Sequence, residues 1–286
     1  MNRVKRSISG YPAVIAILFV LIAQEPAVSE TLEVNGIDMY YQVLGEGEPL
    51  ILLHGGLLHS GDTWKNVADD FARHFQVIIP DLRGHGASTN PSGEYFTTKQ
   101  IAADVFGLLD HLDIDTFKAM GISMGGVTLL HMATQQLDRI DSMVLIGTAG
   151  YLSADSREIG RRTDPYAIPD DQMRRFREIH KHGDQQIISL VERSRKAADD
   201  YQDINFTPPY LSTIKANTLI VHGERDRRVP VSIALEMYQA IPKSLLWIVP
   251  NGGHVPIRDS YEENFIEVAE AFLLGQMTPR RDKNLR

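Results

Sequence analysis

The stretch Gly121-Ile122-Ser123-Met124-Gly125 decides the fold of this chain of 286 residues. It follows an apolar-containing segment at 116–120 and precedes a largely apolar run at 127–130, which predicts a strand that turns sharply into a helix. Glycines on either side of Ser123 relieve crowding, so the serine can hold a strained backbone with its hydroxyl exposed. In this context the G-x-S-x-G pattern indicates a nucleophile. Without other residues it would equally describe a glycine-rich turn with an idle serine.

A serine hydroxyl needs a base to activate it, and the base needs an acid to orient it. His254 comes directly after an apolar run that ends at Val249. Asp226 comes directly after another run that ends at Val221, with Glu224 as a second acid nearby. Each candidate therefore lies in a loop that follows a predicted strand.

Apolar runs and helical patterns alternate along the rest of the chain. Asn35-Gly36 between apolar segments predicts a hairpin, and short continuous apolar runs predict buried parallel strands. Thr97 with Gln100 and Ser260 with Glu263 are candidate capping boxes, and Gly275 is a candidate helix stop. Together they predict an α/β fold, with a mainly parallel central sheet flanked by helices. The predicted buried runs are 50–53, 75–79, 142–146, 217–221 and 245–249.

One long segment interrupts this alternation. Residues 151–215 contain no convincing strand and are dense in Arg, Asp and Glu, with helical patterns at 172–181 and 184–197. Insertions of this length are usually lids or binding elements. We therefore expect a helical cap at 151–215 inserted into a core of residues 30–150 and 216–275, followed by a frayed tail at 276–286.

Five blocks of sequence carry a resemblance to a known family. They are His-Gly-Gly at 54–56, Asp-Leu-Arg-Gly-His-Gly-Ala-Ser at 81–88, and the segments 121–126, 223–230 and 252–256. In content and order the chain resembles α/β-hydrolase-fold serine hydrolases, in the capped branch that includes small esterases and enol-lactonases. The resemblance implies Ser123 as nucleophile, His254 as base and Asp226, rather than Glu224, as the orienting acid. A serine instead of an aspartate at position 123 disfavours haloalkane or epoxide chemistry.

The resemblance also assigns an oxyanion hole. It implies that the backbone N–H groups of Gly56 and Met124 stabilise the oxyanion, with Leu57 as donor if the loop is shifted by one residue. Candidate substrate contacts are Leu57, Tyr151, Phe176, Phe206 and Val255.

For the remaining polar and aromatic residues we expect structural roles rather than direct roles in catalysis. His85 is expected to support the site, and the pair His180 and His182 to lie on a surface helix rather than to bind a metal. We expect neither a metal nor a cofactor. The cap aromatics Tyr166, Phe176, Tyr201, Phe206 and Tyr210 are expected to pack against the core, with one or two lining a substrate channel. Arg174, Arg175 and Arg177 would face water or an anionic substrate.

These residues predict hydrolysis of small or medium carboxylic esters through an acyl-enzyme. A lactonase or enol-lactonase is the alternative, with other acyl or C–C hydrolases open because the fold alone does not choose the substrate. A ligand-binding protein without turnover is a further alternative, although all three triad positions are filled. The expected partner is a small-molecule ester or lactone. The net charge of −8 argues against nucleic acid, and the oligomeric state is open.

Residues 1–29 have the pattern of a signal peptide. Arg3, Lys5 and Arg6 precede an apolar run at 13–23, and Ala27-Val28-Ser29 supplies small residues for cleavage. We expect export to the periplasm or the medium with cleavage near Ser29 and no stable membrane anchor afterwards. An uncleaved anchor and a start codon placed too far upstream are the alternatives. The chain has no cysteine, which excludes disulfides, thiolate metal sites, a cysteine nucleophile and a lipoprotein.

Overall fold

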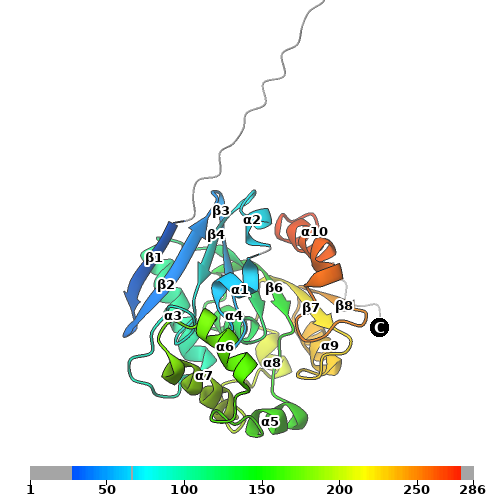
Figure 1. The fold of residues 1–286 in the computed structure, drawn as a ribbon. Helices are drawn as coiled ribbons and strands as arrows, with labels where there is room; N and C mark the ends of the chain where they lie inside the picture. Colours follow the sequence, from blue (N-terminus) through cyan, green and yellow to red (C-terminus); the bar gives the residue numbers. More distant parts are fainter. Residues whose placement is uncertain (1–27, 66, 278–286) are drawn as a thin grey trace, which may run out of the picture.

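The computed structural model describes residues 28–65 and 67–277, and within them the strands form one eight-stranded sheet in the order β1-β2-β4-β3-β5-β6-β7-β8 (Figure 1). Strands β3 to β8 are parallel to their neighbours in that group, and β1 and β2 add an antiparallel edge. The predicted α/β fold with a mainly parallel sheet is confirmed. The strands are β1 (Val28–Val34), β2 (Ile37–Leu44), β3 (Glu48–Leu53), β4 (Phe75–Pro80), β5 (Phe117–Ile122), β6 (Ile140–Ile146), β7 (Asn217–Gly223) and β8 (Ser244–Val249).

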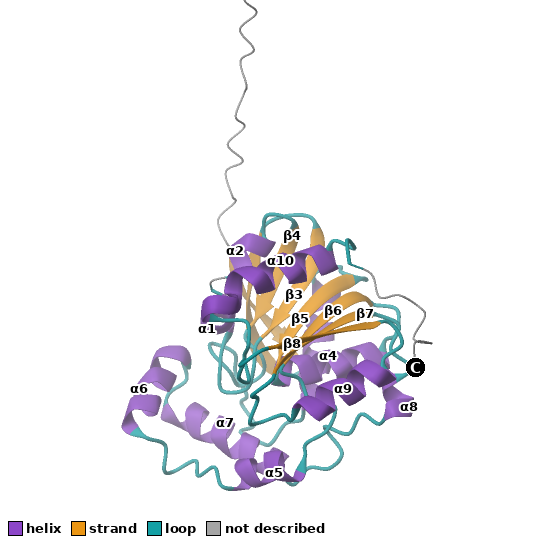
Figure 2. Cartoon of the chain, turned by 90° about the vertical axis from the view of Figure 1, so that its right-hand side faces the viewer, coloured by secondary structure: helices purple, strands orange, loops and turns teal. Residues whose placement is uncertain are grey.

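Helices cover both faces of this sheet. Successive strand residues point to opposite faces, so Leu50 and Leu52 belong to one apolar core and Ile51 and Leu53 to the other. The first core packs against α1 (Ser60–Trp64), α2 (Ala68–Phe71) and α10 (Glu262–Leu273), and the second against α3 (Thr98–His111), α4 (Met124–Gln135) and α9 (Val231–Ala240). Figure 2 shows these two helical layers on either side of the strands. Continuous apolar runs predict this arrangement because both faces are buried.

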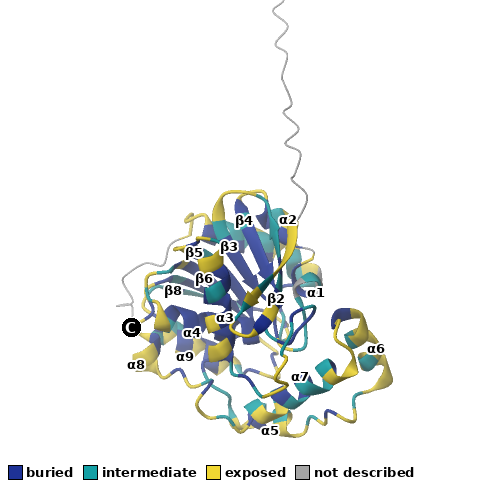
Figure 3. Cartoon of the chain, turned by 90° about the vertical axis from the view of Figure 1, so that its left-hand side faces the viewer, coloured by how far each residue is buried: buried dark blue, intermediate teal, exposed yellow. Residues whose placement is uncertain are grey.

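Four helices lie between β6 and β7, where the sequence predicts the cap. They are α5 (Ala154–Arg161), α6 (Asp170–Ile179), α7 (Asp184–Ala197) and α8 (Pro208–Leu211). In Figures 2 and 3, α5, α6 and α7 lie together beyond the ends of the strands, with much of their surface exposed. The predicted helix at 184–197 coincides with α7, and the pattern at 172–181 corresponds to α6 shifted by two residues.

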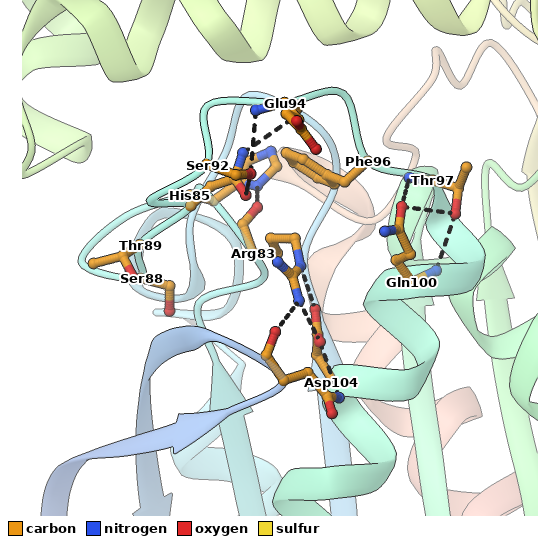
Figure 4. A network of polar contacts seen from close by, with 12 residues as sticks. Arg83, His85, Ser88, Thr89, Ser92, Glu94, Phe96, Thr97, Gln100 and Asp104 are labelled. Carbon is orange, nitrogen blue, oxygen red and sulfur yellow. Dashed lines mark hydrogen bonds and ion pairs between the residues drawn. The ribbon is translucent and has the colours of Figure 1, made fainter.

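Of the two predicted capping boxes, the structure contains one. Thr97 caps α3: its hydroxyl accepts the N–H of Gln100 (3.1 Å), and the Gln100 side chain accepts the N–H of Thr97 (2.9 Å; Figure 4). The box predicted at Ser260 is wrong. Residues 259–261 form a 3₁₀ turn and α10 begins at Glu262, so Tyr261 is the N-cap residue and makes no side-chain capping bond.

The predicted signal peptide and tail fall mostly outside the described residues. Val28 and Ser29 are the first residues of β1, where they pair with Val43 and Gln42. The tail is described only to Met277. In the part of the chain that the structure describes, no helix is long and apolar enough to cross a membrane.

A buried ion pair connects three separated parts of the core. Arg83, in the loop after β4, donates from Nε and Nη2 to the two carboxylate oxygens of Asp104 on α3, at 2.7 Å each (Figure 4). Asn35, in the β1–β2 hairpin, adds a bond from Nδ2 to Asp104 (3.1 Å) and accepts Arg83 Nη2 at its carbonyl oxygen (3.0 Å). The Asp104 side chain is 1% exposed and that of Arg83 12%.

We predict that Asp104→Ala lowers the free energy of unfolding by about 3–5 kcal/mol, because it leaves the Arg83 guanidinium buried without its counter-ion. Urea denaturation at neutral pH measures this change. The matched control is Asp138→Ala, which removes the partner of Lys215 in an ion pair whose side chains are 81% and 55% exposed. That change should cost less than about 1 kcal/mol. Equal losses in the two variants would contradict the role of the buried pair.

Candidate active site

The turn at Ser123 presents its side chain between β5 and α4. Ser123 has φ 50° and ψ −110°, a conformation that L-residues rarely adopt. Its N–H donates to the Ile146 carbonyl (2.8 Å), which fixes the turn to the neighbouring strand. Gly125 is needed because a Cβ at that position would lie 2.3 Å from the carbonyl oxygen of Leu53. The G-x-S-x-G stretch therefore forms the predicted strained turn.

The three residues predicted as a triad meet in one hydrogen-bonded line. His254 Nε2 is 2.9 Å from Ser123 Oγ, and His254 Nδ1 is 2.7 Å from Asp226 Oδ2. Asp226 follows β7 and His254 follows β8, so both loops reach the same end of the sheet as the turn at Ser123. Gly147 makes room for the histidine loop, since a Cβ there would lie 2.3 Å from the His254 carbonyl oxygen.

The environment of Asp226 favours a carboxylate. Its side chain is fully buried. Burial opposes ionisation, but the hydrogen bond to His254 and the N–H groups of Val229 (3.0 Å) and Arg228 (2.8 Å) outweigh it, so the pKa of Asp226 lies below its ordinary value. Glu224, the alternative acid, instead accepts the N–H of Asn251 (2.9 Å) and is exposed. The structure thus brings Asp226, not Glu224, to His254.

The residues of the predicted oxyanion hole adjoin Ser123. Met124 is the first residue of α4, where a helix leaves its N–H groups without an intrahelical acceptor. Gly56 lies beside it: a Cβ on Gly56 would be 3.8 Å from Met124 Sδ. Leu57, the alternative donor, has φ 61°, so the loop after β3 is sharply bent at this point. Gly56, Leu57 and Met124 all line the cavity that contains Ser123.

A cavity of about 560 Å³ surrounds Ser123 and His254 and is lined by both the core and the cap. Of the predicted substrate contacts, Leu57, Phe176 and Val255 line it. Tyr151 and Phe206 are not among its lining residues. Tyr151 bridges to Asn205 and donates its hydroxyl to Glu236 (3.1 Å). Phe206 is buried between His131 and Tyr210.

The other cap aromatics and the arginine cluster lie in different environments, some exposed and some at the cavity. Tyr166 is 80% exposed, so the expectation that it packs against the core is wrong. Tyr201 is 58% exposed and stacks on Arg157 of α5, whose guanidinium carbon lies 3.8 Å from the ring centre, so its expected packing against the core is also wrong. Arg177 pairs with Asp184 (2.7 Å), while Arg175 lines the cavity.

Sequence reasoning missed Arg193, a buried cation in the cavity wall. It lies on α7, donates from Nε to the Phe96 carbonyl (3.0 Å) and stacks over the Phe96 ring at 4.8 Å. Among the described residues its two terminal nitrogens make no hydrogen bond. Its signal in the sequence was weak, because α7 is rich in charged residues and only the fold shows which one faces inward.

Three buried histidines join the core to the cap. Ring centres of His54 and His85 are 5.1 Å apart, and those of His85 and His180 are 6.1 Å apart. His180 Nδ1 accepts the N–H of Gly86 (3.0 Å), and the neighbouring N–H of Lys181 donates to the Gly86 carbonyl (2.9 Å). The expectation that His180 and His182 lie on a surface helix is therefore wrong, because both come after the end of α6 and before α7. The contact with Gly86 buries His180, whereas His182 is exposed and bonds the Ala87 carbonyl (2.9 Å). Within the described ranges no cluster of three potential metal ligands is present.

Comparison with known proteins agrees with this geometry. A family model described as alpha/beta hydrolase fold matches residues 48–177, and one described as TAP-like protein matches residues 200–284. A protein of Synechocystis sp. named as a non-heme chloroperoxidase is 30% identical, with 76% of this chain and 88% of that protein covered. The 2-hydroxy-6-oxo-6-(2'-aminophenyl)hexa-2,4-dienoic acid hydrolase of Metapseudomonas resinovorans is 28% identical, with 86% and 91% covered.

A solved structure has the same fold. A thermophilic esterase from Thermogutta terrifontis superposes with a TM-score of 0.67 at 25% identity, covering 88% of this chain and 99% of that one. The chain belongs to the α/β-hydrolase fold family, and it is similar to members that are serine hydrolases. Names of the relatives support a hydrolase that acts on small molecules.

We predict that stability falls on acidification through His180. Burial lowers the pKa of both His54 and His180 to about 4, so the unfolded chain, in which the ordinary value is 6.5, takes up protons first. The free energy of unfolding is therefore intact above pH 6.5 and falls as the pH drops towards 4. Between pH 7 and pH 5 the contribution of His180 is about 2 kcal/mol.

The variant His180→Asn tests this, because asparagine keeps an acceptor near the position of Nδ1 but does not titrate. In urea denaturation at pH 7 and pH 5, it should lose about 2 kcal/mol less than the wild type on acidification. His182→Asn, at the neighbouring exposed ring, is the matched control and should follow the wild type. An identical pH dependence in all three proteins would refute the prediction.

Proposed function

We propose that this protein hydrolyses carboxylic esters of small or medium size through an acyl-enzyme. The observation that carries the proposal is the line from Ser123 Oγ through His254 to the Asp226 carboxylate, at 2.9 and 2.7 Å, in a cavity of about 560 Å³. These distances are within the range needed for a proton to pass from the nucleophile to the base.

The steps follow from the positions of these groups. Ser123 Oγ attacks the ester carbonyl carbon while His254 Nε2 takes the hydroxyl proton, and Asp226 stabilises the imidazolium that forms. The N–H groups of Met124 and Gly56 donate to the oxyanion. The C–O bond then breaks, and His254 gives its proton to the leaving alcohol. Water, activated by His254, cleaves the acyl-enzyme to release the acid and restore Ser123.

The walls of the cavity support an uncharged acyl or alcohol group near the serine. Leu57, Val127, Phe176 and Val255 contribute apolar side chains around the site of attack. Mostly apolar walls with a few polar groups are typical of small-molecule sites.

A second candidate is the hydrolysis of a C–C bond next to a ketone in a carboxylic acid. Arg193 favours it, since a buried guanidinium in the cavity wall can pair with a substrate carboxylate, and the relative from Metapseudomonas resinovorans is named for such an acid. In this reaction water adds to the carbonyl carbon, the C–C bond breaks, and the departing carbon takes a proton. A lactone would use the first mechanism, with the alcohol retained on the acyl group.

We predict that the purified protein releases p-nitrophenol from short-chain p-nitrophenyl esters and that a fluorophosphonate labels Ser123. Ser123→Ala should abolish the label and reduce turnover by several orders of magnitude. Asp226→Asn should reduce kcat by about 10⁴, because His254 loses the carboxylate that fixes its tautomer. Glu224→Gln is the matched control and should keep the activity of the wild type.

The substrates in the same assay separate the candidates. Esters of increasing chain length, several lactones and a 2-hydroxy-6-oxo-dienoic acid are compared by kcat/KM. A preference for lactones or for the dienoic acid would replace the ester assignment with that candidate. Near-native turnover in Ser123→Ala would remove Ser123 from the mechanism, and a wild type that neither reacts with the probe nor turns over any substrate would indicate a ligand-binding protein.

We also propose that the protein is exported and cleaved near Ser29, on the basis of the basic, apolar and small-residue segments in 1–29. Cleavage after Ser29 would leave the pairs from Glu30 to Val34 in β1, so the hairpin would retain most of its register. Expression with the full leader and mass spectrometry of the exported fraction should give a chain that begins at about residue 30. A protein that retains Met1 and stays in the cytoplasm would contradict the proposal.

A further inference from the structure

His222 is a buried histidine beside Asp226 that the hydrolytic steps above do not use. It is the penultimate residue of β7, and its side chain is completely buried. Its Nε2 lies 2.9 Å from the Val229 carbonyl oxygen and 3.6 Å from Asp226 Oδ2. A second imidazole thus lies next to the acid that orients His254.

The protonation state of His222 follows from these contacts. A carbonyl oxygen only accepts hydrogen bonds, so His222 Nε2 must carry a proton and donate it to the Val229 carbonyl. Burial lowers the pKa of His222, which keeps the ring neutral and leaves Nδ1 without a proton. Among the described residues this Nδ1 has no hydrogen-bond partner. The ring is therefore a donor with a single fixed direction.

Val229 connects this donor to Asp226. The Val229 N–H donates to Asp226 Oδ1 (3.0 Å), while its carbonyl oxygen accepts from His222. The Arg228 N–H adds a bond to the same carboxylate oxygen (2.8 Å), which leaves Oδ2 directed at His254. The turn at 226–229 is consequently held from both sides, by the carboxylate within it and by His222 behind it.

If His222 only filled space, an apolar side chain of similar volume could replace it without affecting the triad. An apolar side chain of similar volume would fill the same buried position and leave packing intact. It would, however, leave the carbonyl of the buried Val229 without its donor, which is costly for a buried acceptor. The charged or titratable groups that face the ring are Asp226 and His254, so the consequences of losing the donor fall on the triad.

We propose that His222 is a positioning residue of the triad, whose Nε2–H holds the Val229 carbonyl and thereby the turn that directs the Asp226 carboxylate at His254. The proposal rests on the proposed function, since it explains how the same triad keeps its geometry. His222 touches neither the substrate nor the reacting atoms.

The expected effect appears in kcat and in the pH dependence of kcat/KM. In His222→Phe the ring volume is kept but the donor is lost, so the turn relaxes and Asp226 holds the His254 imidazolium less well. We expect kcat to fall roughly ten- to a hundredfold, the size of effect that a slightly misplaced catalytic group produces, with KM nearly unchanged. The acid limb of the kcat/KM profile should move to lower pH, because a carboxylate that is held less firmly stabilises the imidazolium less. His222→Gln places an N–H near the position of Nε2 and should restore both values to within a few-fold of the wild type.

Two measurements test this. The pH profiles of kcat and kcat/KM are compared for the wild type, His222→Phe and His222→Gln. In parallel, ¹H–¹⁵N NMR follows the Nδ1–H resonance of His254, which reports its hydrogen bond to Asp226, in the Ser123→Ala background of each protein. This resonance should move in the apolar variant and return in His222→Gln. The measurement needs no turnover and so decides the proposal even if the proposed ester hydrolysis is absent. His222→Leu replaces the phenylalanine variant if that variant does not fold.

Equal impairment of the apolar variant and His222→Gln would overturn the proposal, because it would show that the shape of the ring, not its donor, matters. An unchanged Nδ1–H resonance of His254 and an unchanged kcat in the apolar variant would also overturn it. Recovery by glutamine alone supports it.

Discussion

The strained backbone at Ser123 is the constraint on which the rest of the site depends. A residue with φ 50° between a strand and a helix costs of order 1–3 kcal/mol and persists only where its surroundings fix it. Here the fixing contacts are the bond from the Ser123 N–H to β6 and the close approach of Gly125 to β3. Both partners are strands in the middle of the sheet, where the backbone is most firmly held. The positions of the serine hydroxyl and the Met124 N–H are therefore fixed by contacts of this turn with the sheet.

The remaining polar groups are arranged around that fixed point. Asp226 and His254 arrive on loops from β7 and β8, and each carboxylate oxygen of Asp226 has its own donors before any substrate binds. Such preorganisation is what electrostatic stabilisation of a transition state requires. The buried pair of Arg83 and Asp104 plays a different part, because it connects the hairpin, the loop after β4 and α3. At these two places the buried charge therefore has its partners in position.

Much of the core could be predicted from the sequence, and the reasons are local. Continuous apolar runs identify strands buried on both faces, Asn35-Gly36 fits a hairpin turn that needs two positive φ angles, and the glycines around Ser123 fit only a close strand-to-helix turn. The Thr97 box formed because α3 begins at the next residue. Ser260 has the same spacing to Glu263, but a 3₁₀ turn at 259–261 delays the start of α10 to Glu262, and the local pattern does not reveal that turn.

The cap was harder to predict because its determinants are distant in sequence. His180 is buried by Gly86, which lies 94 positions away, and no helical period around His180 reports that contact. Arg193 looks like the other arginines of a polar helix, yet it lines the cavity, while Tyr151 and Phe206 look like channel residues and pack elsewhere. The position of a side chain cannot be predicted from local sequence pattern when its neighbours come from a distant segment of the chain.

The hydrogen bonds that attach the cap to the core are confined to particular segments of the cap. Residues 180–186 are tied to the loop at 84–88 by His180, Lys181 and Gln186, and Asp203 is tied to the first N–H groups of α3. By contrast, the connection between α5 and α6 lines the cavity at Thr163, Asp164 and Ile168, and the backbone hydrogen bonds of residues 163–167 found in the described chain are to near neighbours in sequence. The cap is therefore hydrogen-bonded to the core at residues 180–186 and at Asp203, whereas the cavity-lining segment at 163–168 is held by local bonds. We expect a bulky substrate group to be accommodated by displacement of the segment at 163–168, with the distance between Ser123 and His254 unchanged.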